Sequence, residues 1–342
     1  MIAGKKILVT GGLGYIGSHT ALALLAQDAE VIIIDNLSNT RHEVLDTIQQ
    51  LSGKTVSYYN IDLCDIKNTE AVFNKHQINA CIHFAAFKSV GDSVSDPLTY
   101  YKNNLYSLIN LLELYKKYDY DNLIFSSSCS VYGDADELPV SETTALKTAQ
   151  SPYGNTKQIG EEILKDHCKS NPLKSIALRY FNPCGAHPSA LLGEYPLQPP
   201  NNLVPVITQT AIGKRPNMTI FGGDYETTDG TCVRDFIHVI DIADAHVLAV
   251  KRLLAKEQNS NFEIFNLGTG NGNTVLEAIK AFESVNQVKL NYTIGPRREG
   301  DVVKVYASTT KAAKELNWRA KLGLNDIMRS AWLWEQTLKN KI

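Results

Sequence analysis

The sequence has little excess charge of either sign. Its 34 Lys and Arg residues nearly balance 36 Asp and Glu, which gives a net charge of -2 and a pI of about 6.5. A protein that follows the phosphates of nucleic acid shows a basic face and a high pI, so we expect no nucleic-acid partner. Two or three well-placed arginines would still suffice to bind a small anion.

Paired cysteines and long apolar runs are also missing. The six cysteines stand apart, at positions 64, 81, 129, 168, 184 and 232, without CxxC spacing. We therefore expect neither a disulfide nor zinc, nor any other bound metal. No apolar run reaches the length of a membrane span, and the first residues lead into a strand without an apolar leader. These absences predict a cytoplasmic protein with no membrane partner.

Strand-like and helical segments alternate in the first half of the chain. Apolar runs rich in β-branched residues occupy residues 5–10, 30–35, 80–84, 122–127 and 174–180. Between two of them, Leu105, Leu108, Leu112 and Tyr115 recur at helical intervals. Such alternation predicts an α/β fold with βαβ units and a Rossmann-type, doubly wound parallel sheet that is covered on both faces.

The pattern changes after residue 182. Residues 183–231 are rich in Pro, Gly and Asn, and alternation resumes at 234–268 with a helix near 241–253 and a strand at 262–266. Residues 273–342 show two amphipathic helices and a loop at 295–301. We expect two interleaved domains: a larger one of residues 1–182 plus 234–268, and a smaller α/β domain of residues 183–233 plus 269–342.

A glycine-rich loop follows the first predicted strand. The loop contains Gly11 and Gly14 and leads into a helix that starts near Tyr15 and includes Gly17. Small residues in this loop let a pyrophosphate reach the backbone amides at the helix N-terminus, which is the positive end of the helix dipole. Asp35 ends the second strand about twenty residues further on, where a carboxylate binds ribose hydroxyls and repels a 2′-phosphate. Glycines and an aspartate also occur in ordinary turns, but in this order they predict that the larger domain binds NAD rather than NADP. Asp62-Leu63, after the third strand, would then lie beside the adenine.

Tyr153 and Lys157 are four residues apart and so share one face of a predicted helix. A phenol titrates near pH 10 and is a poor base at neutral pH. One positive charge at about 5 Å, in an effective dielectric of about 20, favours the phenolate by roughly 3 kcal/mol, or about two pKa units. The Lys157 ammonium and an oxidised nicotinamide can supply two such charges. With Ser128 at a strand end to hydrogen-bond the reacting oxygen, the pair predicts acid–base redox chemistry on a hydroxyl, although each feature alone also arises by chance.

These motifs resemble the extended short-chain dehydrogenase/reductase family and, within it, the UDP-glucose 4-epimerases. The resemblance extends over nearly the whole chain, through residues 11–19, 83–91, 126–133, 178–183, 201–203, 233–239 and 298–301. It implies an isomerase that interconverts UDP-galactose and UDP-glucose. The hydride at the sugar C4 would pass to tightly bound NAD and return through a 4-keto intermediate. The smaller domain would bind the UDP-hexose. The family also implies a homodimer through helices near 98–117 and 151–170, whose apolar stripes fit internal packing equally well.

The resemblance also assigns roles to individual residues. Tyr153 would be the acid/base, Ser128 its hydroxyl partner, and Lys157 the group that lowers its pKa and holds the nicotinamide ribose. The implied cofactor contacts are Gly11, Gly14, Tyr15, Ile16, Gly17, Asp35, Asn36, Asn39, Asp62, Leu63, Phe84, Ala85, Lys88, Asn103, Ser126, Tyr153, Lys157 and Tyr180. The implied substrate contacts are Lys88, Ser128, Tyr153, Asn182, Asn202, Leu203, Thr219, Phe221, Arg234, Arg298, Asp301 and Val305. Arg234, Arg298 and Asp301 would hold the diphosphate and the uridine ribose, and residues 219–221 would flank the uracil.

Departures from the family pattern leave alternatives open. Ala86-Phe87 replaces a common Gly-Leu pair, and Leu13 replaces a small residue, both as packing changes. Val305 is intermediate between the tyrosine of members that exclude N-acetylated sugars and the small residue of members that admit them. A UDP-N-acetylglucosamine/UDP-N-acetylgalactosamine 4-epimerase, or a dual-specificity enzyme, is therefore the alternative.

Two further alternatives are weaker. A 4,6-dehydratase would carry an Asp-Glu pair after the active-site hydroxyl residue, where this chain has Cys129-Ser130. A non-catalytic NAD-sensing regulator would have no need to retain Tyr153, Lys157 and Ser128. Both observations favour an epimerase.

Overall fold

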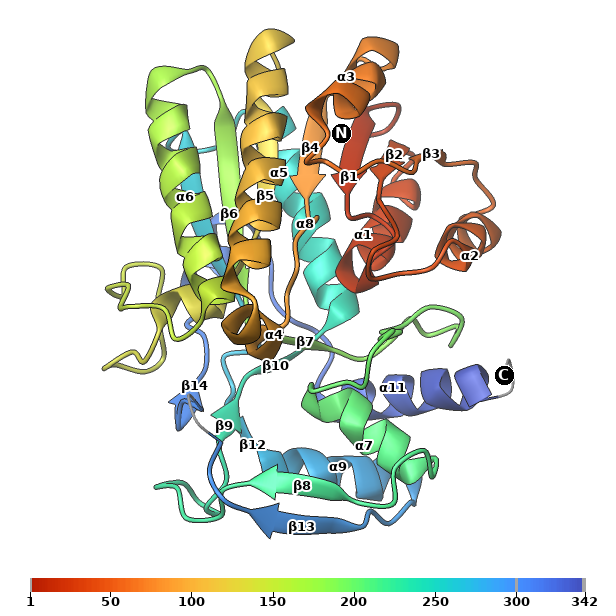
Figure 1. Cartoon of the computed structure of the whole chain (residues 1–342), viewed down its shortest axis with the longest axis vertical. Coiled ribbons are helices and arrows are strands. Elements are labelled where there is room, and N and C mark those ends of the chain that lie inside the picture. Colours follow the sequence, from red (N-terminus) through yellow and green to blue (C-terminus); the bar gives the residue numbers. More distant parts are fainter. Residues whose placement is uncertain (1, 299–300, 340–342) are drawn as a thin grey trace.

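The larger part of the protein is a parallel β-sheet flanked by helices, as Figure 1 shows for the computed structural model, which describes residues 2–298 and 301–339. Seven strands pair in the order β11-β6-β5-β4-β1-β2-β3, all in parallel. They are β1 (Lys6–Thr10), β2 (Glu30–Ile34), β3 (Ser57–Tyr59), β4 (Ala80–His83), β5 (Asn122–Ser128), β6 (Lys174–Tyr180) and β11 (Phe262–Leu267). The order from β3 to β6 is that of a doubly wound dinucleotide-binding sheet. The predicted Rossmann-type fold is confirmed.

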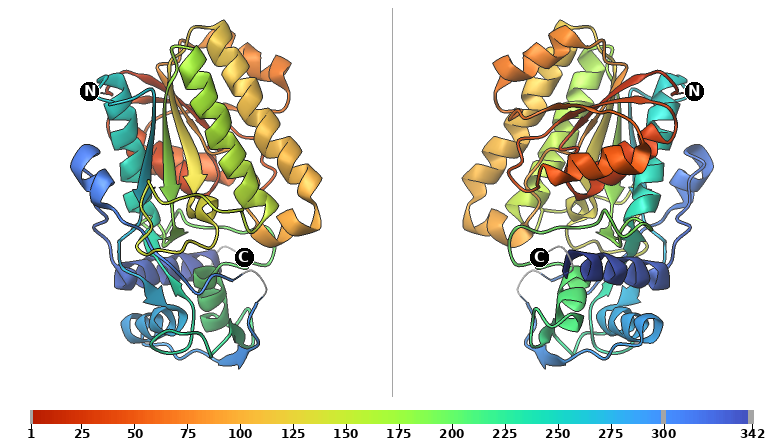
Figure 2. Two further views of the ribbon diagram at one scale, coloured as in Figure 1. Left: turned by 90° about the vertical axis from the view of Figure 1, so that its left-hand side faces the viewer. Right: turned by 90° about the vertical axis from the view of Figure 1, so that its right-hand side faces the viewer.

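Helices cover both faces of this sheet, which Figure 2 shows from two sides. One face packs against α1 (Tyr15–Leu25), α2 (Glu43–Ser52) and α8 (Val239–Leu254), and the other against α3 (Ile66–Lys75), α5 (Pro97–Lys117) and α6 (Pro152–Ser170). In β2, Ile33 belongs to the first core, while Ile32 and Ile34 belong to the second. A strand buried on both sides needs apolar residues at every position, which explains its continuous hydrophobic run.

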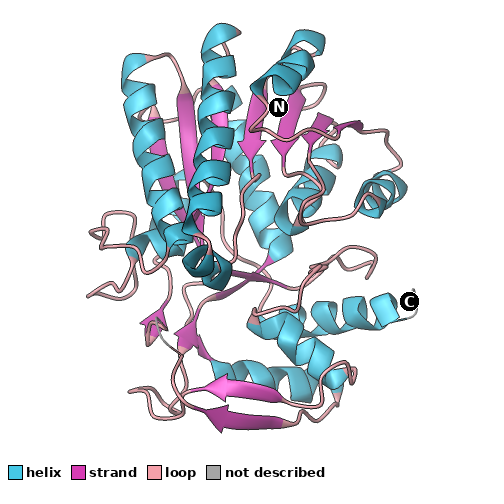
Figure 3. Cartoon of the chain, viewed as in Figure 1, coloured by secondary structure: helices cyan, strands magenta, loops and turns pink. Residues whose placement is uncertain are grey.

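The smaller part lies below the carboxyl edge of the sheet and has its own core. It contains α7 (Leu203–Ala211), α9 (Val275–Asn286) and α11 (Leu324–Lys339), with the parallel pair β8 (Met218–Phe221) and β13 (Tyr292–Gly295). Ile207, Ile220, Phe282 and Met328 are among the buried residues of this core. Figure 3 shows these helices and strands apart from the large sheet.

Short strands lie between the two parts. β7 (Asn182–Cys184) pairs with β10 (Phe236–His238), and β9 (Val233–Arg234) pairs with β12 (Asn273–Thr274) and β14 (Lys304–Val305). The chain therefore crosses from the sheet to the smaller part and back before it returns to form β11.

Within the described ranges, no helix is both long and apolar enough to cross a membrane.

The described residues also form three short helices: α4 (Val90–Ser95), a 3₁₀ turn at Cys129–Tyr132 and α10 (Thr310–Glu315). The two amphipathic helices predicted in residues 273–342 are α9 and α11, whereas α10 was not predicted, because it is too short for a periodic apolar pattern to show. Ala312, Leu316 and Trp318 join the core on the α1 face of the sheet. We therefore propose that residues 310–318 belong to the larger domain, and we retain the other predicted boundaries as a proposal.

Candidate active site

The glycine loop between β1 and α1 is packed so closely that side chains do not fit. A Cβ on Gly11 would lie 2.7 Å from the Ala85 nitrogen, and one on Gly17 would lie 2.3 Å from the Gly11 oxygen. Gly11 also has a φ of +66°, which favours glycine. The N-cap residue of α1, Gly14, makes no side-chain cap, and the first turn holds no acidic residue. The helix N-terminus is thus open to an anion, so the residues present fit the pyrophosphate of NAD.

Asp35 follows β2 and has a role that the sequence did not reveal. Its side chain is buried, and its two oxygens accept hydrogen bonds from Leu13 N at 3.0 Å and Leu37 N at 2.9 Å. Burial raises the pKa of the carboxyl, while the amide donors oppose that rise. Asp35 therefore fastens the glycine loop to the end of β2, in addition to its predicted contact with a ribose.

Other predicted cofactor contacts gather around this loop. Asn36 donates a hydrogen bond to Asp62 at 3.2 Å, whereas Asn39 is exposed further along the loop. The Leu63 side chain lies in the core and its carbonyl accepts a hydrogen bond from Asn110, so its place beside the adenine stays a prediction for its backbone. The remaining predicted contacts on this side are Ile16, Phe84 and Ala85, all half-buried, and Asn103, which donates to Asn104 at 3.0 Å.

The predicted catalytic residues meet where β5 ends and α6 begins. The Ser151 hydroxyl caps α6 by accepting from Gly154 N at 3.1 Å, which places Tyr153 in the first turn and Lys157 one turn later. The Ser128 hydroxyl lies beside the Tyr153 phenol and favours its ionised form. The Lys157 ammonium donates to the Ser126 carbonyl at 2.7 Å and lies 5.9 Å from the centre of the Tyr153 ring.

Burial is the largest influence on the pKa values of Tyr153 and Lys157. It raises the pKa of Tyr153 to about 12, with the Ser128 hydrogen bond opposing the rise, and it lowers the pKa of Lys157 from 10.5 to about 8. We expected Lys157 to lower the pKa of the phenol. In the structure burial is the largest influence on the phenol, because a phenolate loses its hydration inside the protein. Lowering the pKa of Tyr153 thus requires positive charge beyond that of Lys157.

A buried network of hydrogen bonds and an ion pair lies next to these residues and was not predicted from the sequence. Glu161, two helical turns after Tyr153, accepts hydrogen bonds from Ser127 at 2.5 Å and from Arg179 Nε at 2.9 Å. The Glu161 and Arg179 side chains are 5% and 3% exposed. The network joins β5, α6 and β6, and the charge of Glu161 raises the pKa of Lys157 against the effect of burial. Its only sequence signal was a charged pair in otherwise apolar surroundings.

Tyr180 is the last residue of β6, and Asn182 begins β7, which leads toward the smaller part. The Tyr180 hydroxyl is hydrogen-bonded to the Ser126 hydroxyl. The side-chain oxygen of Asn182 is buried and has no hydrogen-bond partner within the described chain. An unpaired buried acceptor is costly, so a ligand that donates a hydrogen bond fits this position.

The predicted diphosphate residues also come together. Asp301 Oδ1 accepts from Arg234 at 3.3 Å and from Arg298 at 2.9 Å, so one carboxylate orients both guanidinium groups. The Arg298 guanidinium lies 5.5 Å from the centre of the exposed Phe221 ring. Thr219 is likewise exposed, and Val305 in β14 lies opposite Arg234 of β9. Residues 299 and 300 of the predicted 298–301 motif lie outside the described residues.

Lys88 and Asn202 share a partner that the sequence did not predict. Glu194 Oε1 lies 2.9 Å from Lys88 Nζ and accepts from Asn202 Nδ2 at 3.2 Å. Asn202 is the N-cap residue of α7, in which Leu203 is the first residue. Glu194 therefore links a predicted cofactor contact to a predicted substrate contact.

Comparison with known proteins gives consistent matches. A family model described as GDP-mannose 4,6 dehydratase matches residues 8–331. The UDP-glucose 4-epimerase of Erwinia amylovora is 48% identical over 96% of this chain and 97% of its own. The crystal structure of UDP-glucose 4-epimerase from Bifidobacterium longum in complex with NAD+ and UDP is 42% identical, covers 99% of this chain and 100% of its own, and has a TM-score of 0.94. The UDP-Glc/GlcNAc 4-epimerase of Campylobacter jejuni is 38% identical over 98% and 100% of the two chains, with a TM-score of 0.84.

Proposed function

Because this chain belongs to the UDP-glucose 4-epimerase family, we propose that it interconverts UDP-galactose and UDP-glucose with tightly bound NAD. The observation that carries the proposal is the juxtaposition of Tyr153, Ser128 and Lys157 at the sheet edge that also bears the glycine loop. Ligands of doubly wound sheets bind beyond this edge, where the strands end.

The chain's own residues supply the acid–base steps. NAD, when bound at the glycine loop, supplies reversible hydride chemistry at the sugar C4. Tyr153 takes the proton of the 4-hydroxyl, and Ser128 hydrogen-bonds the same oxygen. The Lys157 ammonium, with its pKa of about 8, is charged at neutral pH and favours the phenolate. When the hydride returns to the other face of the 4-keto sugar, the phenol gives its proton back to the oxygen.

Inversion requires the sugar to turn while the rest of the substrate stays fixed. Arg234 and Arg298 suit this task because Asp301 holds both guanidinium groups in place, and arginine can bind a diphosphate through two hydrogen bonds. Asn182 offers its unpaired oxygen to a sugar hydroxyl or the uridine. A firm clamp on the diphosphate leaves the hexose free to present either face.

The residues after Ser128 support epimerisation over dehydration, the activity in the description of the matching family model. Cys129 and Ser130 stand where a dehydratase would carry Asp-Glu. Burial raises the pKa of the Cys129 thiol to about 12, so this thiol does not replace the carboxyl groups of an Asp-Glu pair. Ser130 N donates to the Ser128 hydroxyl at 3.2 Å and so helps to orient the catalytic serine.

The test is direct. Purified protein should convert UDP-galactose to UDP-glucose without added NAD, and the Tyr153→Phe variant serves as the inactive control. Absence of turnover with or without NAD would refute the proposal. Bound NAD without turnover would instead support an NAD-sensing regulator.

A second activity, on UDP-N-acetylglucosamine, is favoured by Val305. Valine leaves more room than tyrosine where β14 faces Arg234, and the Campylobacter jejuni relative is named for both sugars. We expect slow turnover of UDP-N-acetylglucosamine in the same assay. In Val305→Tyr, its rate relative to that on UDP-galactose should fall at least about tenfold, the discrimination typical of a steric change in a pocket. An unchanged ratio would contradict this assignment.

We also propose that a second copy covers α4 and α5. Leu98, Tyr106 and Ile109 are exposed on α5, with Leu98 78% accessible, and Val90 and Val94 are exposed on α4. Contiguous exposed apolar residues of this kind mark interfaces. Sedimentation should show a dimer that Leu98→Glu dissociates, whereas a monomeric wild type would refute the proposal.

The six unpaired cysteines support a reducing compartment such as the cytoplasm.

A further inference from the structure

The segment from β7 to α7 crosses the mouth of the proposed cofactor site. We call residues 185–202 the strap; Figure 1 shows it in green between the ends of α1 and α2 and the helix α11. Leu192 of the strap is buried in the core on the α1 face of the sheet, and the ring centre of His187 lies 6.4 Å from that of His19 in α1. Three further contacts with the sheet domain are polar or cation–π contacts. Tyr15 donates a hydrogen bond to the Gly185 carbonyl at 2.6 Å, the Arg41 guanidinium lies 4.4 Å from the centre of the Tyr195 ring, and Lys88 pairs with Glu194.

These contacts surround the position expected for the cofactor. Tyr15 is the first residue of α1, whose N-terminus fits the pyrophosphate. Arg41 follows Asp35 in the loop after β2, and Lys88 lies in the loop after β4. The strap therefore bridges the ends of three neighbouring strands, across the opening through which a dinucleotide enters.

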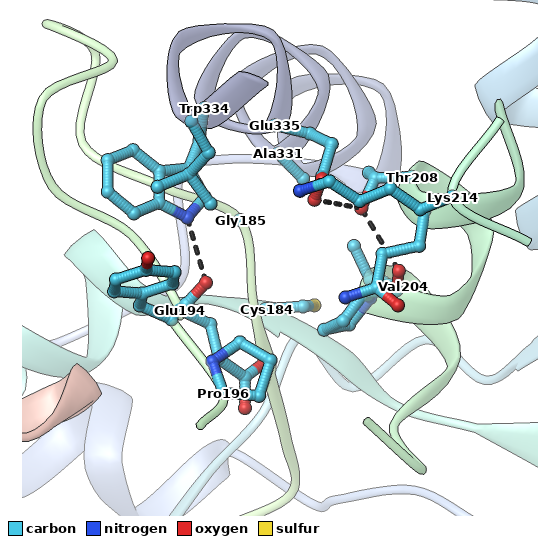
Figure 4. Close-up of a pocket in the computed structure, with 14 residues that line it drawn as sticks. Cys184, Gly185, Glu194, Pro196, Val204, Thr208, Lys214, Ala331, Trp334 and Glu335 are labelled. Carbon is cyan, nitrogen blue, oxygen red and sulfur yellow. Dashed lines mark hydrogen bonds and ion pairs between the residues drawn. The ribbon is translucent and has the colours of Figure 1, made fainter. Parts of the chain in front are cut away.

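On its other side, the strap borders a cavity beside the small apolar cluster of Ala186, Tyr195, Trp334 and Leu338. The cavity holds about 120 Å³ between the strap, α7 and α11, and its lining includes Cys184, Tyr195, Thr208 and Lys214. Figure 4 shows Trp334 of α11 reaching across to donate its indole N–H to the Glu194 carbonyl, at 2.8 Å. Because protein cores are normally close-packed, this empty space leaves residues 194–196 dependent on directed contacts, whereas Ala186 and Leu192 anchor the strap by apolar burial.

We infer that the strap retains the cofactor, with Tyr195 and Trp334 as positioning residues that keep it closed over the pyrophosphate end of the NAD site. This rests on the proposed function, in which NAD stays bound between turnovers. Opening the strap breaks the Arg41–Tyr195 contact and the Trp334–Glu194 hydrogen bond, so these two contacts slow the release of NAD. Neither Tyr195 nor Trp334 is a predicted contact of the sugar.

The test is the rate of NAD release from the holoenzyme of a Tyr195→Leu/Trp334→Phe variant. Both changes are uncharged, so the electrostatic field at the phosphates stays the same. The holoenzyme is freed of unbound NAD, diluted, and assayed for NAD in the filtrate over time. Release should be about tenfold faster than from the wild type, which corresponds to about 1.4 kcal/mol. Saturating NAD should restore wild-type turnover.

A matched control makes the same chemical changes elsewhere. Trp332 packs against Phe282 on another side of α11, and Tyr292 is exposed on β13. Tyr292→Leu/Trp332→Phe should release NAD at the wild-type rate. If the double strap variant fails to fold, Tyr195→Leu alone should still release NAD about threefold faster, in keeping with the strength of one exposed cation–π contact.

The outcomes separate this inference from the proposed function. Release from the strap variant within twofold of the wild-type rate would overturn the role of the strap, even in an active epimerase. Equal acceleration in the control variant would do the same. A wild-type protein that neither contains nor binds NAD would overturn the proposed function itself.

Discussion

Replacing Lys157 by methionine should abolish turnover and yet stabilise the NAD-free protein at neutral pH. The Lys157 side chain is buried, and burial lowers its pKa from 10.5 to about 8. Each pKa unit corresponds to 1.36 kcal/mol, so keeping the ammonium charged in the fold costs about 3 kcal/mol. Methionine removes that cost but also removes the donor to the Ser126 carbonyl, a loss of about 1 kcal/mol. The net gain at pH 7 is about 2 kcal/mol.

The pH dependence has a definite sign. Below pH 8 Lys157 is charged in both the folded and the unfolded state, so the wild type bears the full cost. Between pH 8 and 10.5 the folded state loses its proton first, the unfolded state binds more protons, and wild-type stability rises with pH. The advantage of Lys157→Met should therefore shrink through this window and become a deficit of about 1 kcal/mol above it.

Urea unfolding of the NAD-free proteins at several pH values between 7 and 10 measures this difference. Lys169→Met is a suitable control, because Lys169 is an exposed lysine on the same helix, α6. Its unfolding free energy should stay within about 0.5 kcal/mol of the wild type, as for most surface changes. A Lys157→Met protein that is less stable than the wild type at pH 7, or a difference that does not change with pH, would refute the reasoning.

Three further predictions concern the cofactor loop and the catalytic residues. Tyr153→Phe should keep NAD, as shown by its absorbance in the purified protein, and lose at least about 100-fold in turnover, as expected when a general base is removed; normal turnover would contradict its role as the base. Gly17→Ala places a Cβ 2.3 Å from the Gly11 oxygen, so it should lose bound NAD, and retention of a full equivalent would show that the loop tolerates the change. Glu161→Gln leaves the Arg179 cation buried without its partner charge, and should lower the unfolding free energy by about 3 kcal/mol or more in urea titrations. A change below about 1 kcal/mol there would show that the pair is not needed for stability.

Local patterns were enough to predict six strands of the large sheet (β1, β2, β4, β5, β6 and β11), the fold class and the two motifs. The hydrophobic run of β2 identifies a strand buried on both faces, and the spacing of Tyr153 and Lys157 identifies one face of a helix, because both depend on residues close together in the chain. α10 could not be predicted in this way. Six residues make fewer than two helical turns, and the helix is held by Ala312 against the sheet core.

Contacts between residues that are far apart in the chain could not be predicted from the sequence. Glu161 with Arg179 and Lys88 with Glu194 are pairs whose members come from different elements, and no spacing rule connects them. The sequence did predict Lys88 and Asn202 as binding residues by resemblance. Only the structure shows that one carboxylate holds both.

The sequence by itself determined the catalytic side chains and the backbone conformations that they need, because a phenol, an ammonium and a glycine turn are properties of residues and of their near neighbours. The tertiary structure decided the ionisation of those side chains and how the site closes. Burial raises the pKa of Tyr153 to about 12 and lowers that of Lys157 to about 8, and Tyr195 of the strap contacts Arg41, which is distant in the chain. Both are consequences of which distant segments exclude water, which is set only when the whole chain has packed.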